Sequence, residues 1–291
     1  MVILITGGSG FIGHHLIRKL IDEGHQVRIL DKQKPEQNVE WIKGDILEKD
    51  DISRACRDVS YIFHLAAIAD VNVALSDPRY CIEVNEIGTI NILEAARSYE
   101  VDRVILASTT WVYGNQEKVN ENSPIPHPDH IYTKTKIGQE NLIYNWYKTY
   151  GLPYTILRYD IPYGPMMRSN LVLAIFTRRA KLGQSVTVFG NGEQGRCFIY
   201  VEDLAEGNVS SLQESGKNEI FNLAGNEFIT INDILRILKN YFSNLNVEYA
   251  PSRVGDFLGV KVDINKAKQR LDWQPKISYE EGVKRYLDSI H

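Results

Sequence analysis

After Met1 the chain reads Val2-Ile3-Leu4-Ile5-Thr6-Gly7-Gly8-Ser9-Gly10-Phe11-Ile12-Gly13, and this stretch decides the fold. The continuous apolar, β-branched run at residues 2–5 predicts a strand that is covered on both faces. Apolar residues then recur at helical spacing up to Gly24, and residues 27–30 read as the next strand. A strand, a helix and a second strand in this order build a parallel sheet.

The glycines between the first strand and the first helix predict a phosphate-binding loop. Gly8, Gly10 and Gly13 fit the pattern G-x-G-x-x-G in the required strand-to-helix context, and Gly7 adds an earlier glycine. Without β-carbons the backbone can turn tightly and approach a pyrophosphate, while the amides at the helix N-terminus face its negative charge. We therefore expect a bound dinucleotide, and the residues predicted to hold it here are Gly7, Gly10, Phe11, Ile12 and Gly13.

The residue at the end of the second strand indicates which dinucleotide is bound. Asp31 lies 18 residues beyond Gly13, where a carboxylate accepts hydrogen bonds from the adenosine ribose and repels a 2′-phosphate. NAD is therefore the predicted cofactor, although the neighbouring Lys32 leaves a case for NADP. Without the glycine loop, Asp31 reads equally well as a solvated turn carboxylate.

The alternation of strands and helices continues and then changes character. Further buried strands are predicted at residues 61–65, 104–107 and 154–157, with helices at 88–99 and 132–150. After Gly164 the pattern becomes irregular. We predict an α/β chain with a Rossmann-type doubly wound parallel sheet and a smaller C-terminal α/β substrate-binding domain. Residues 1–164 form the NAD-binding domain, segments at about 196–222 return to it, and residues 165–291 mainly bind the substrate.

The composition excludes several kinds of binding partner and indicates the cellular compartment. Lys and Arg number 33 against 37 Asp and Glu, so the net charge of −4 offers no broad positive field for nucleic acid. No apolar run approaches the ~20 residues of a membrane span, and the N-terminus lacks the pattern of a signal peptide. Cys56, Cys81 and Cys197 are far apart and show no metal-ligand spacing. We expect a cytoplasmic protein with no metal, no nucleic-acid partner and no membrane association.

Tyr132 and Lys136 are candidates for acid–base chemistry. They are four residues apart at the start of a predicted helix, so both side chains can lie on one face. A nearby ammonium favours the phenolate, which would make Tyr132 a base for a substrate hydroxyl. The hydroxyl-rich segment at residues 108–110 leaves the carboxyl end of a buried strand, where such sheets bind ligands. The pair alone is also typical of a solvated helix, so its interpretation depends on the glycine loop.

Taken together, the residues resemble the extended short-chain dehydrogenase/reductase family, in its NAD-dependent nucleotide-sugar epimerase and dehydratase branch, which includes UDP-glucose and UDP-glucuronate 4-epimerases. The resemblance spans nearly the whole chain. Besides the glycine loop and the Tyr132-x-x-x-Lys136 pair, the matching motifs are Gly44-Asp45-Ile46, His64-Leu65-Ala66-Ala67, Asn85 with Gly88-Thr89 and Asn91, Arg158, Tyr163-Gly164-Pro165, residues 196–203, and Arg253 with Gly255-Asp256.

The resemblance implies roles for particular residues. Asp45 and Ile46 would flank the adenine, and Lys136 would also hold the nicotinamide ribose. The implied cofactor wall further contains Leu65, Ala66 and Ala67. Thr109 aligns with the active-site Ser/Thr, so the implied catalytic residues are Thr109, Tyr132 and Lys136. The implied substrate-binding residues are Thr109, Thr110, Trp111, Tyr132, Asn170, Arg196 and Arg253. The planar guanidinium groups of the two arginines suit the oxygens of a diphosphate. Without its motif, each arginine would be interpreted as a member of a surface ion pair.

Two positions depart from the pattern of the branch. Dehydratases usually follow the active-site Thr with Asp-Glu, and decarboxylating relatives tend to place Glu where this chain has Trp111, so water loss and decarboxylation are disfavoured. We expect Trp111 to shape the pocket near the sugar, with ordinary packing as the alternative. After Arg158, sugar epimerases commonly read Tyr-Phe-Asn, whereas this chain reads Tyr159-Asp160-Ile161. Asp160 is either a polar contact in the site or a surface acid.

These observations predict a reaction. The leading hypothesis is an NAD-dependent epimerase that inverts C4 of a nucleoside-diphosphate sugar through a transient 4-keto intermediate. The alternative is a reductase or dehydrogenase of a nucleotide sugar or keto substrate with exchangeable NAD(P). A third hypothesis is a non-catalytic NAD sensor or scaffold. We also expect a homodimer that pairs through the helices at 88–99 and 132–150, where residues 142–150 carry an apolar stripe that core packing explains equally well.

Overall fold

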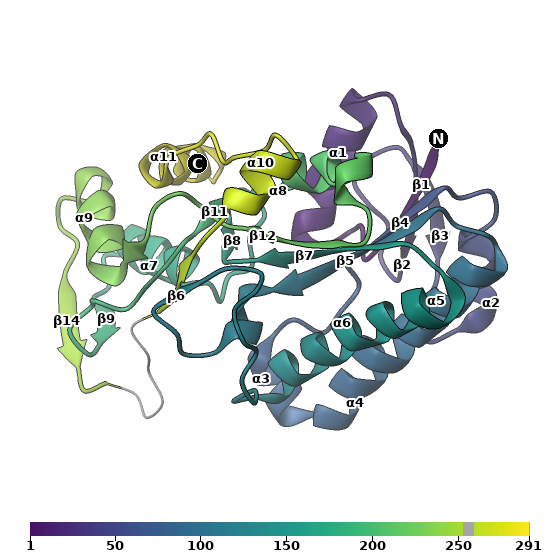
Figure 1. Ribbon diagram of the computed structural model, residues 1–291. Coiled ribbons are helices and arrows are strands. Elements are labelled where there is room, and N and C mark those ends of the chain that lie inside the picture. The colour runs from purple at the N-terminus through teal and green to yellow at the C-terminus, as the bar shows by residue number, and fades with distance from the viewer. Residues whose placement is uncertain (253–258, 291) are drawn as a thin grey trace.

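The computed structural model describes residues 1–252 and 259–290. Its centre is a seven-stranded sheet in the order β12-β7-β5-β4-β1-β2-β3, and every neighbouring pair of strands is parallel (Figure 1). From edge to edge the strands are β12 (Glu219–Leu223), β7 (Tyr154–Tyr159), β5 (Arg103–Thr109), β4 (Tyr61–His64), β1 (Val2–Thr6), β2 (Gln26–Asp31) and β3 (Glu40–Lys43). The predicted α/β fold with a Rossmann-type parallel sheet is confirmed.

Helices cover both faces of this sheet. On one face lie α2 (Lys49–Ala55), α3 (Val71–Ser76), α4 (Pro78–Ile82), the π-helical turn η1 (Glu83–Ile87), α5 (Gly88–Ser98) and α6 (Ile131–Tyr150). On the other face lie α1 (Phe11–Asp22), α8 (Val201–Ser210) and α10 (Asn265–Arg270). Residues alternate between two buried clusters, since Ile3 and Ile5 pack toward α1 whereas Leu4 packs toward α5 and α6. Burial on both faces explains the continuous apolar run of β1.

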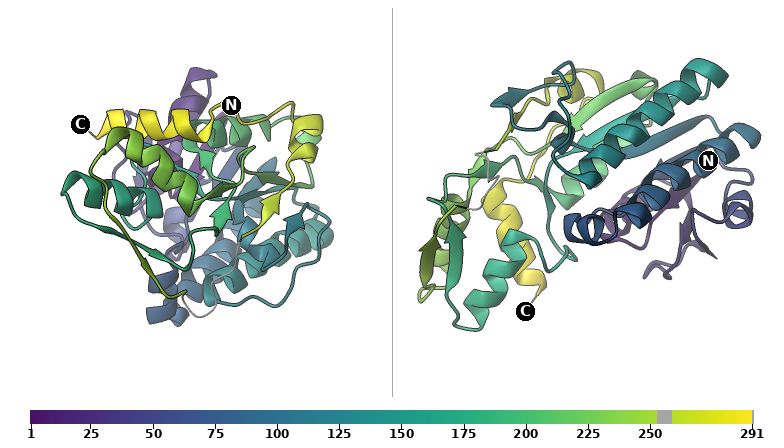
Figure 2. Two further views of the ribbon diagram at one scale, coloured as in Figure 1. Left: turned by 90° about the vertical axis from the view of Figure 1, so that its left-hand side faces the viewer. Right: turned by 90° about the horizontal axis from the view of Figure 1, so that it is seen from below.

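The remaining elements gather beside one end of the sheet (Figures 1 and 2). They include α7 (Val172–Lys181), α9 (Ile231–Tyr241), α11 (Tyr279–Ser289) and the parallel pair β9 (Val186–Phe189) and β14 (Val247–Ala250). Three further strand pairs lie outside the seven-stranded sheet: β8 (Pro162–Tyr163) with β11 (Ile199–Tyr200), β10 (Gly195–Arg196) with β13 (Ile229–Thr230), and β6 (Lys118–Val119) with β15 (Lys261–Val262). Short 3₁₀ turns are η2 (Thr110–Tyr113) and η3 (Glu214–Gly216).

The chain crosses between the two parts more than once. After α7 and β9 it returns through β11 and α8 to β12, which pairs with β7 at the edge of the sheet. The carboxyl ends of β1, β4, β5 and β7 therefore face the C-terminal elements, and ligands of such sheets bind at this edge. Among the described residues, no helix has both the length and the apolar character that crossing a membrane requires.

Candidate active site

The loop between β1 and α1 forms a cradle in which only glycine fits. Gly7 has φ +72°, and a β-carbon on it would lie 2.8 Å from the backbone of Ala66. A β-carbon on Gly13 would clash with the backbone of Gly8. Gly10 is the N-cap of α1 and supplies no side-chain acceptor, so the first amides of the helix stay available to an anion.

Asp31 borders this cradle from the end of β2. Its carboxylate accepts the backbone N–H of Ser9 at 3.0 Å and of Gln33 at 2.9 Å. It lines a cavity of about 370 Å³. The other predicted cofactor residues on the wall of this cavity are Gly7, Gly10, Lys32, Asp45, Ile46, Leu65, Ala66 and Ala67. The ammonium of Lys32 is paired with Asp45 at 2.7 Å, which favours a ribose hydroxyl over a 2′-phosphate as the neighbour of Asp31.

A second cavity, of about 690 Å³, continues from the same cradle. Both cavities share Gly7, Gly10, Leu65 and Ala67, and the larger one adds Phe11, Ile12 and Gly13. Two cavities joined at a phosphate cradle suit the two nucleoside halves of a dinucleotide. The residues present therefore fit NAD, with Asp31 on the adenosine side and the glycine loop at the pyrophosphate.

Helix α6 and strand β5 bring two of the three predicted catalytic residues to the larger cavity, whereas Lys136 is not on its wall. Tyr132 and Thr109 line its wall. Lys136 follows one helical turn after Tyr132, and its ammonium lies 6.0 Å from the centre of the Tyr132 ring. The same ammonium donates a hydrogen bond of 2.8 Å to the carbonyl oxygen of Ala107 on β5. His130 caps the N-terminus of α6 by accepting from the backbone of Thr133, so the helix begins immediately before Tyr132.

The electrostatics of this pair differ from the sequence-based expectation. Burial raises the pKa of Tyr132 to about 12, although the Arg168 guanidinium and the Thr109 hydroxyl act in the opposite direction. Burial also lowers the pKa of Lys136 to about 8, against the opposing effect of Glu140. At Tyr132, desolvation of the charged form therefore outweighs the neighbouring positive charge, so the net shift of its pKa is upward.

Trp111 packs beside the predicted catalytic residue Tyr132. Its ring packs edge-on against His130 at 5.3 Å and against Tyr132 at 6.2 Å between centroids. It lines the larger cavity, and its buried indole N–H has no hydrogen-bond partner among the described atoms. Trp111 thus contributes both to the cavity wall and to the packing of Tyr132.

Asp160 is a buried acid, so the alternative of a surface acid is wrong. Its carboxylate accepts the Thr110 hydroxyl at 3.1 Å and the backbone N–H of Cys197 at 2.8 Å. Burial raises the pKa of Asp160 to about 6. Asp160 lines the larger cavity, whereas Thr110, a predicted substrate residue, is absent from the lining and is held by Asp160. The carboxylate connects the ends of β5 and β7 to the segment that carries Arg196.

The other predicted substrate residues are dispersed. Asn170 lines the larger cavity and donates to Asp70 at 2.7 Å. Arg196 lies on β10, donates to the carbonyl oxygen of Gly195 and lines none of the cavities named here. Arg253 lies outside the described residues. The structure thus brings Thr109, Tyr132 and Asn170 to one cavity wall and leaves Arg196 apart from them.

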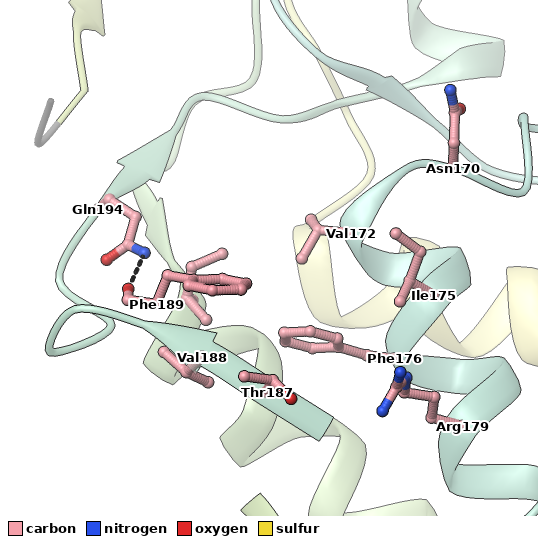
Figure 3. A pocket seen from close by; sticks show the side chains of 10 residues that line it. Asn170, Val172, Ile175, Phe176, Arg179, Thr187, Val188, Phe189 and Gln194 are labelled. Atoms are coloured by element: carbon pink, nitrogen blue, oxygen red, sulfur yellow. Dashed lines mark hydrogen bonds between the residues drawn. The ribbon is translucent and has the colours of Figure 1, made fainter. Parts of the chain in front are cut away.

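A third cavity, of about 500 Å³, opens beside Asn170 between α7 and β9 (Figure 3). The rings of Phe176 and Phe189 and the guanidinium of Arg179 lie on its wall. Gln194 donates to the carbonyl oxygen of Phe189 at 2.7 Å across one end. Asn170 lines both this cavity and the larger one, so the two are adjacent.

Sequence reasoning missed several of these residues. Phe176 and Phe189 read as ordinary apolar positions of a helix and a strand, and nothing local marks them as cavity residues. Arg168 is an exposed cation that lines the larger cavity. Within residues 1–252 and 259–290, no carboxylate lies at ion-pair distance from it. Its position three residues after the Tyr163-Gly164-Pro165 motif is the feature of the sequence that could have marked it as a site residue.

Comparisons with known proteins agree with this geometry. The model of a family described as "NAD dependent epimerase/dehydratase family" matches residues 3–224. A putative UDP-glucose 4-epimerase of Methanocaldococcus jannaschii is 36% identical over 99% of this chain and 97% of its own length. A UDP-glucuronic acid decarboxylase 1 of Danio rerio is 33% identical over 98% of this chain and 71% of its own length.

A solved structure shows the same fold. The UDP-glucuronic acid 4-epimerase of Bacillus cereus, in complex with UDP-glucuronic acid and NAD, matches with a TM-score of 0.93 and 29% identity, covering 100% of this chain and 99% of the other. The glycine cradle, the Tyr132 and Lys136 pair and these matches lead to one conclusion: the chain belongs to the NAD-dependent epimerase/dehydratase family.

Proposed function

We propose that this protein inverts C4 of a nucleoside-diphosphate sugar through a transient 4-keto intermediate, with NAD as its resident cofactor. The observation that carries the proposal is the wall of the larger cavity, on which Thr109 and Tyr132 face the same space as the glycine cradle. The similarity to 4-epimerases supports it.

Tyr132, Thr109 and Lys136 have different proposed roles at C4 of the sugar. Tyr132 takes the proton of the C4 hydroxyl, and Thr109 orients that oxygen by a hydrogen bond. Lys136, held against β5 by Ala107, supplies the positive charge that stabilises the phenolate. NAD, held by the glycine cradle and Asp31, would supply the reversible hydride acceptor that an inversion at C4 without net redox change requires.

The third cavity is our candidate for the nucleotide base. Phe176 and Phe189 offer aromatic surface for stacking, and Asn170 stands between this cavity and the sugar side. A diphosphate that joins the base to the sugar would cross the region of Asn170. Arg196 and Arg253 remain candidates for the diphosphate. Arg168, a cation near Tyr132 without a carboxylate partner in the described part, favours a sugar that carries a negative group, such as the UDP-glucuronic acid of the Bacillus cereus relative.

Two other reactions share the first step. A reductase or dehydrogenase with exchangeable NAD(P) would use the same three residues for one-way hydride transfer, and a decarboxylase would lose CO₂ from the 4-keto intermediate. Purified protein should be incubated with a panel of UDP-sugars, including UDP-glucose and UDP-glucuronate, without added cofactor. Formation of the C4 epimer supports the proposal. Dependence on stoichiometric NAD(H) or NADPH, or release of a pentose product and CO₂, rejects it, and Tyr132→Phe is the inactive control.

We also propose a homodimer that pairs through α5 and α6. In the structure Ile143 is buried, and Leu142, Trp146 and Tyr147 pack against the core, so core packing accounts for most of the predicted stripe. Tyr144 and Tyr150 on α6 nevertheless remain 46% and 53% exposed, which leaves aromatic surface for a partner. Light scattering that detects only monomer at high concentration would reject the proposed dimer.

A cytoplasmic location is also part of the proposal, supported by the free thiols of Cys56, Cys81 and Cys197.

A further inference from the structure

Helix α6 is attached to the sheet by two successive turns of buried side chains. The ammonium of Lys136 donates to the carbonyl oxygen of Ala107, and one turn later the carboxylate of Glu140 accepts the hydroxyl of Ser108 at 2.5 Å. Ala107 and Ser108 are consecutive residues of β5. Lys136 and Glu140 are only 3% and 6% exposed, so water does not screen the charge of either. The residue next along β5 is Thr109, on the cavity wall.

Glu140 is itself fixed by the neighbouring strand. Arg158 on β7 donates to both of its carboxylate oxygens, from Nε at 3.0 Å and from Nη2 at 2.6 Å. Arg158 pairs directly with Ser108 in the β5–β7 register, which explains why both reach one carboxylate. The guanidinium also donates to Tyr113 at 2.9 Å. Glu140 is therefore fully hydrogen-bonded in a single orientation.

Glu140, paired with Arg158, is the carboxylate whose charge acts on the buried Lys136 ammonium in the described part of the chain. In the described part of the chain, the titratable groups near Lys136 are Tyr132 and Glu140 on α6, Cys81 on α4 and His64 on β4, with Arg158 of β7 behind Glu140. Burial keeps His64 neutral, since it lowers the pKa of that imidazole to about 3. Burial likewise disfavours the thiolate of Cys81, whose pKa is raised. Without Glu140, two buried cations, Lys136 and Arg158, would remain uncompensated.

We propose that Glu140 is a positioning residue of the active site: clamped by Arg158 and Ser108, it holds Lys136 in the charged form beside Tyr132. The inference rests on the proposed role of Lys136. The Glu140–Arg158 ion pair thereby serves the reaction as well as the fold.

The first test is the pH dependence of the variant Glu140→Gln. Loss of the carboxylate charge lowers the pKa of Lys136, so the charged ammonium disappears at a lower pH than in the wild type. The ratio of variant to wild-type kcat is expected to be within about twofold of 1 at pH 6 and to fall about tenfold by pH 8. A purely structural role would reduce kcat by the same factor at every pH, and that result, or an unchanged kcat, would overturn the proposal.

The second test does not depend on turnover. NMR titration of ¹³C-labelled lysine side chains, with Lys136 assigned from Lys136→Met, should show the Lys136 midpoint about one pH unit or more lower in Glu140→Gln than in the wild type. An unchanged midpoint rejects the inference even if the protein epimerises UDP-sugars. A lowered midpoint in a protein that converts none of them supports the charge compensation and rejects the proposed function instead.

Two further variants separate charge from folding. Glu140→Gln leaves Arg158 buried without a carboxylate partner, which threatens the fold. The double variant Glu140→Gln/Arg158→Met removes both charges of the pair and should still lower the Lys136 midpoint. The conservative variant Glu140→Asp keeps the charge and should leave the midpoint close to the wild-type value. If Glu140→Asp lowers the midpoint as far as Glu140→Gln does, charge compensation is wrong.

Discussion

Replacing Lys136 by methionine should stabilise the protein at neutral pH while it abolishes activity. Burial lowers the pKa of this lysine from 10.5 to about 8, so the folded chain binds the proton more weakly than the unfolded chain. This difference costs about 3 kcal/mol of folding free energy at pH 7. Methionine has a similar length without the charge, and loss of the hydrogen bond to Ala107 offsets about 1 kcal/mol. A net stabilisation of about 2 kcal/mol is expected.

The sign of the pH dependence follows from the two pKa values. Between pH 8 and pH 10.5 the unfolded chain holds this proton and the folded chain has released it, so the lysine's contribution to stability rises with pH across that window. The gain in free energy of unfolding of Lys136→Met over the wild type should therefore be largest below pH 8 and decline toward pH 10.5. Removing the ammonium also removes the charge that assists Tyr132.

The assay is urea denaturation of wild type and variant at pH 7 and pH 10, analysed for the free energy of unfolding. The matched control is Lys148→Met on the same helix, because Lys148 is exposed and has no carboxylate at ion-pair distance in the described residues. It should change stability by less than about 0.5 kcal/mol at either pH. If Lys136→Met is destabilised at pH 7, or if its advantage is the same at both pH values, the reasoning fails.

Three further predictions concern the cavities. Gly7→Ala should weaken NAD binding and destabilise the fold by more than about 1 kcal/mol, because its β-carbon meets the backbone of Ala66. Gly24→Ala, with φ +79° and nothing within 4 Å, carries only the conformational cost and should leave NAD affinity, measured by calorimetry, intact. Trp111→Ala should change the ratio of kcat/KM values between UDP-sugars, since the indole lines the cavity beside Tyr132; an unchanged ratio assigns Trp111 to packing alone. Arg168→Met should raise KM for UDP-glucuronate about tenfold or more and leave KM for UDP-glucose within about twofold, and equal effects on both would contradict its role as a carboxylate partner.

Local patterns account for what could be predicted. The strand at residues 2–5, the glycine loop and the helix that begins near Tyr132 depend on periodicity and on glycine at fixed offsets, which are properties of neighbouring residues. The structure extends these elements by only a residue or two, as in α6 at Ile131–Tyr150. The short edge strand β3 escaped prediction because its four residues carry only two large apolar side chains, Trp41 and Ile42.

Contacts between residues far apart in the sequence determined the features of the site that could not be predicted. Asp160 is an acid at the end of a strand, and only its contacts with Thr110 and Cys197 make it a buried one. The cavity wall of Phe176 and Phe189 forms where α7 meets β9, and no local pattern marks that meeting.

The sequence by itself identified Tyr132 and Lys136 as the candidate groups for the chemistry, since they stand one helical turn apart in any fold that keeps the helix. Tertiary structure alone decided how their pKa values shift. Desolvation depends on every segment that packs around a side chain, so the direction in which their pKa values move could not be obtained from spacing along the chain.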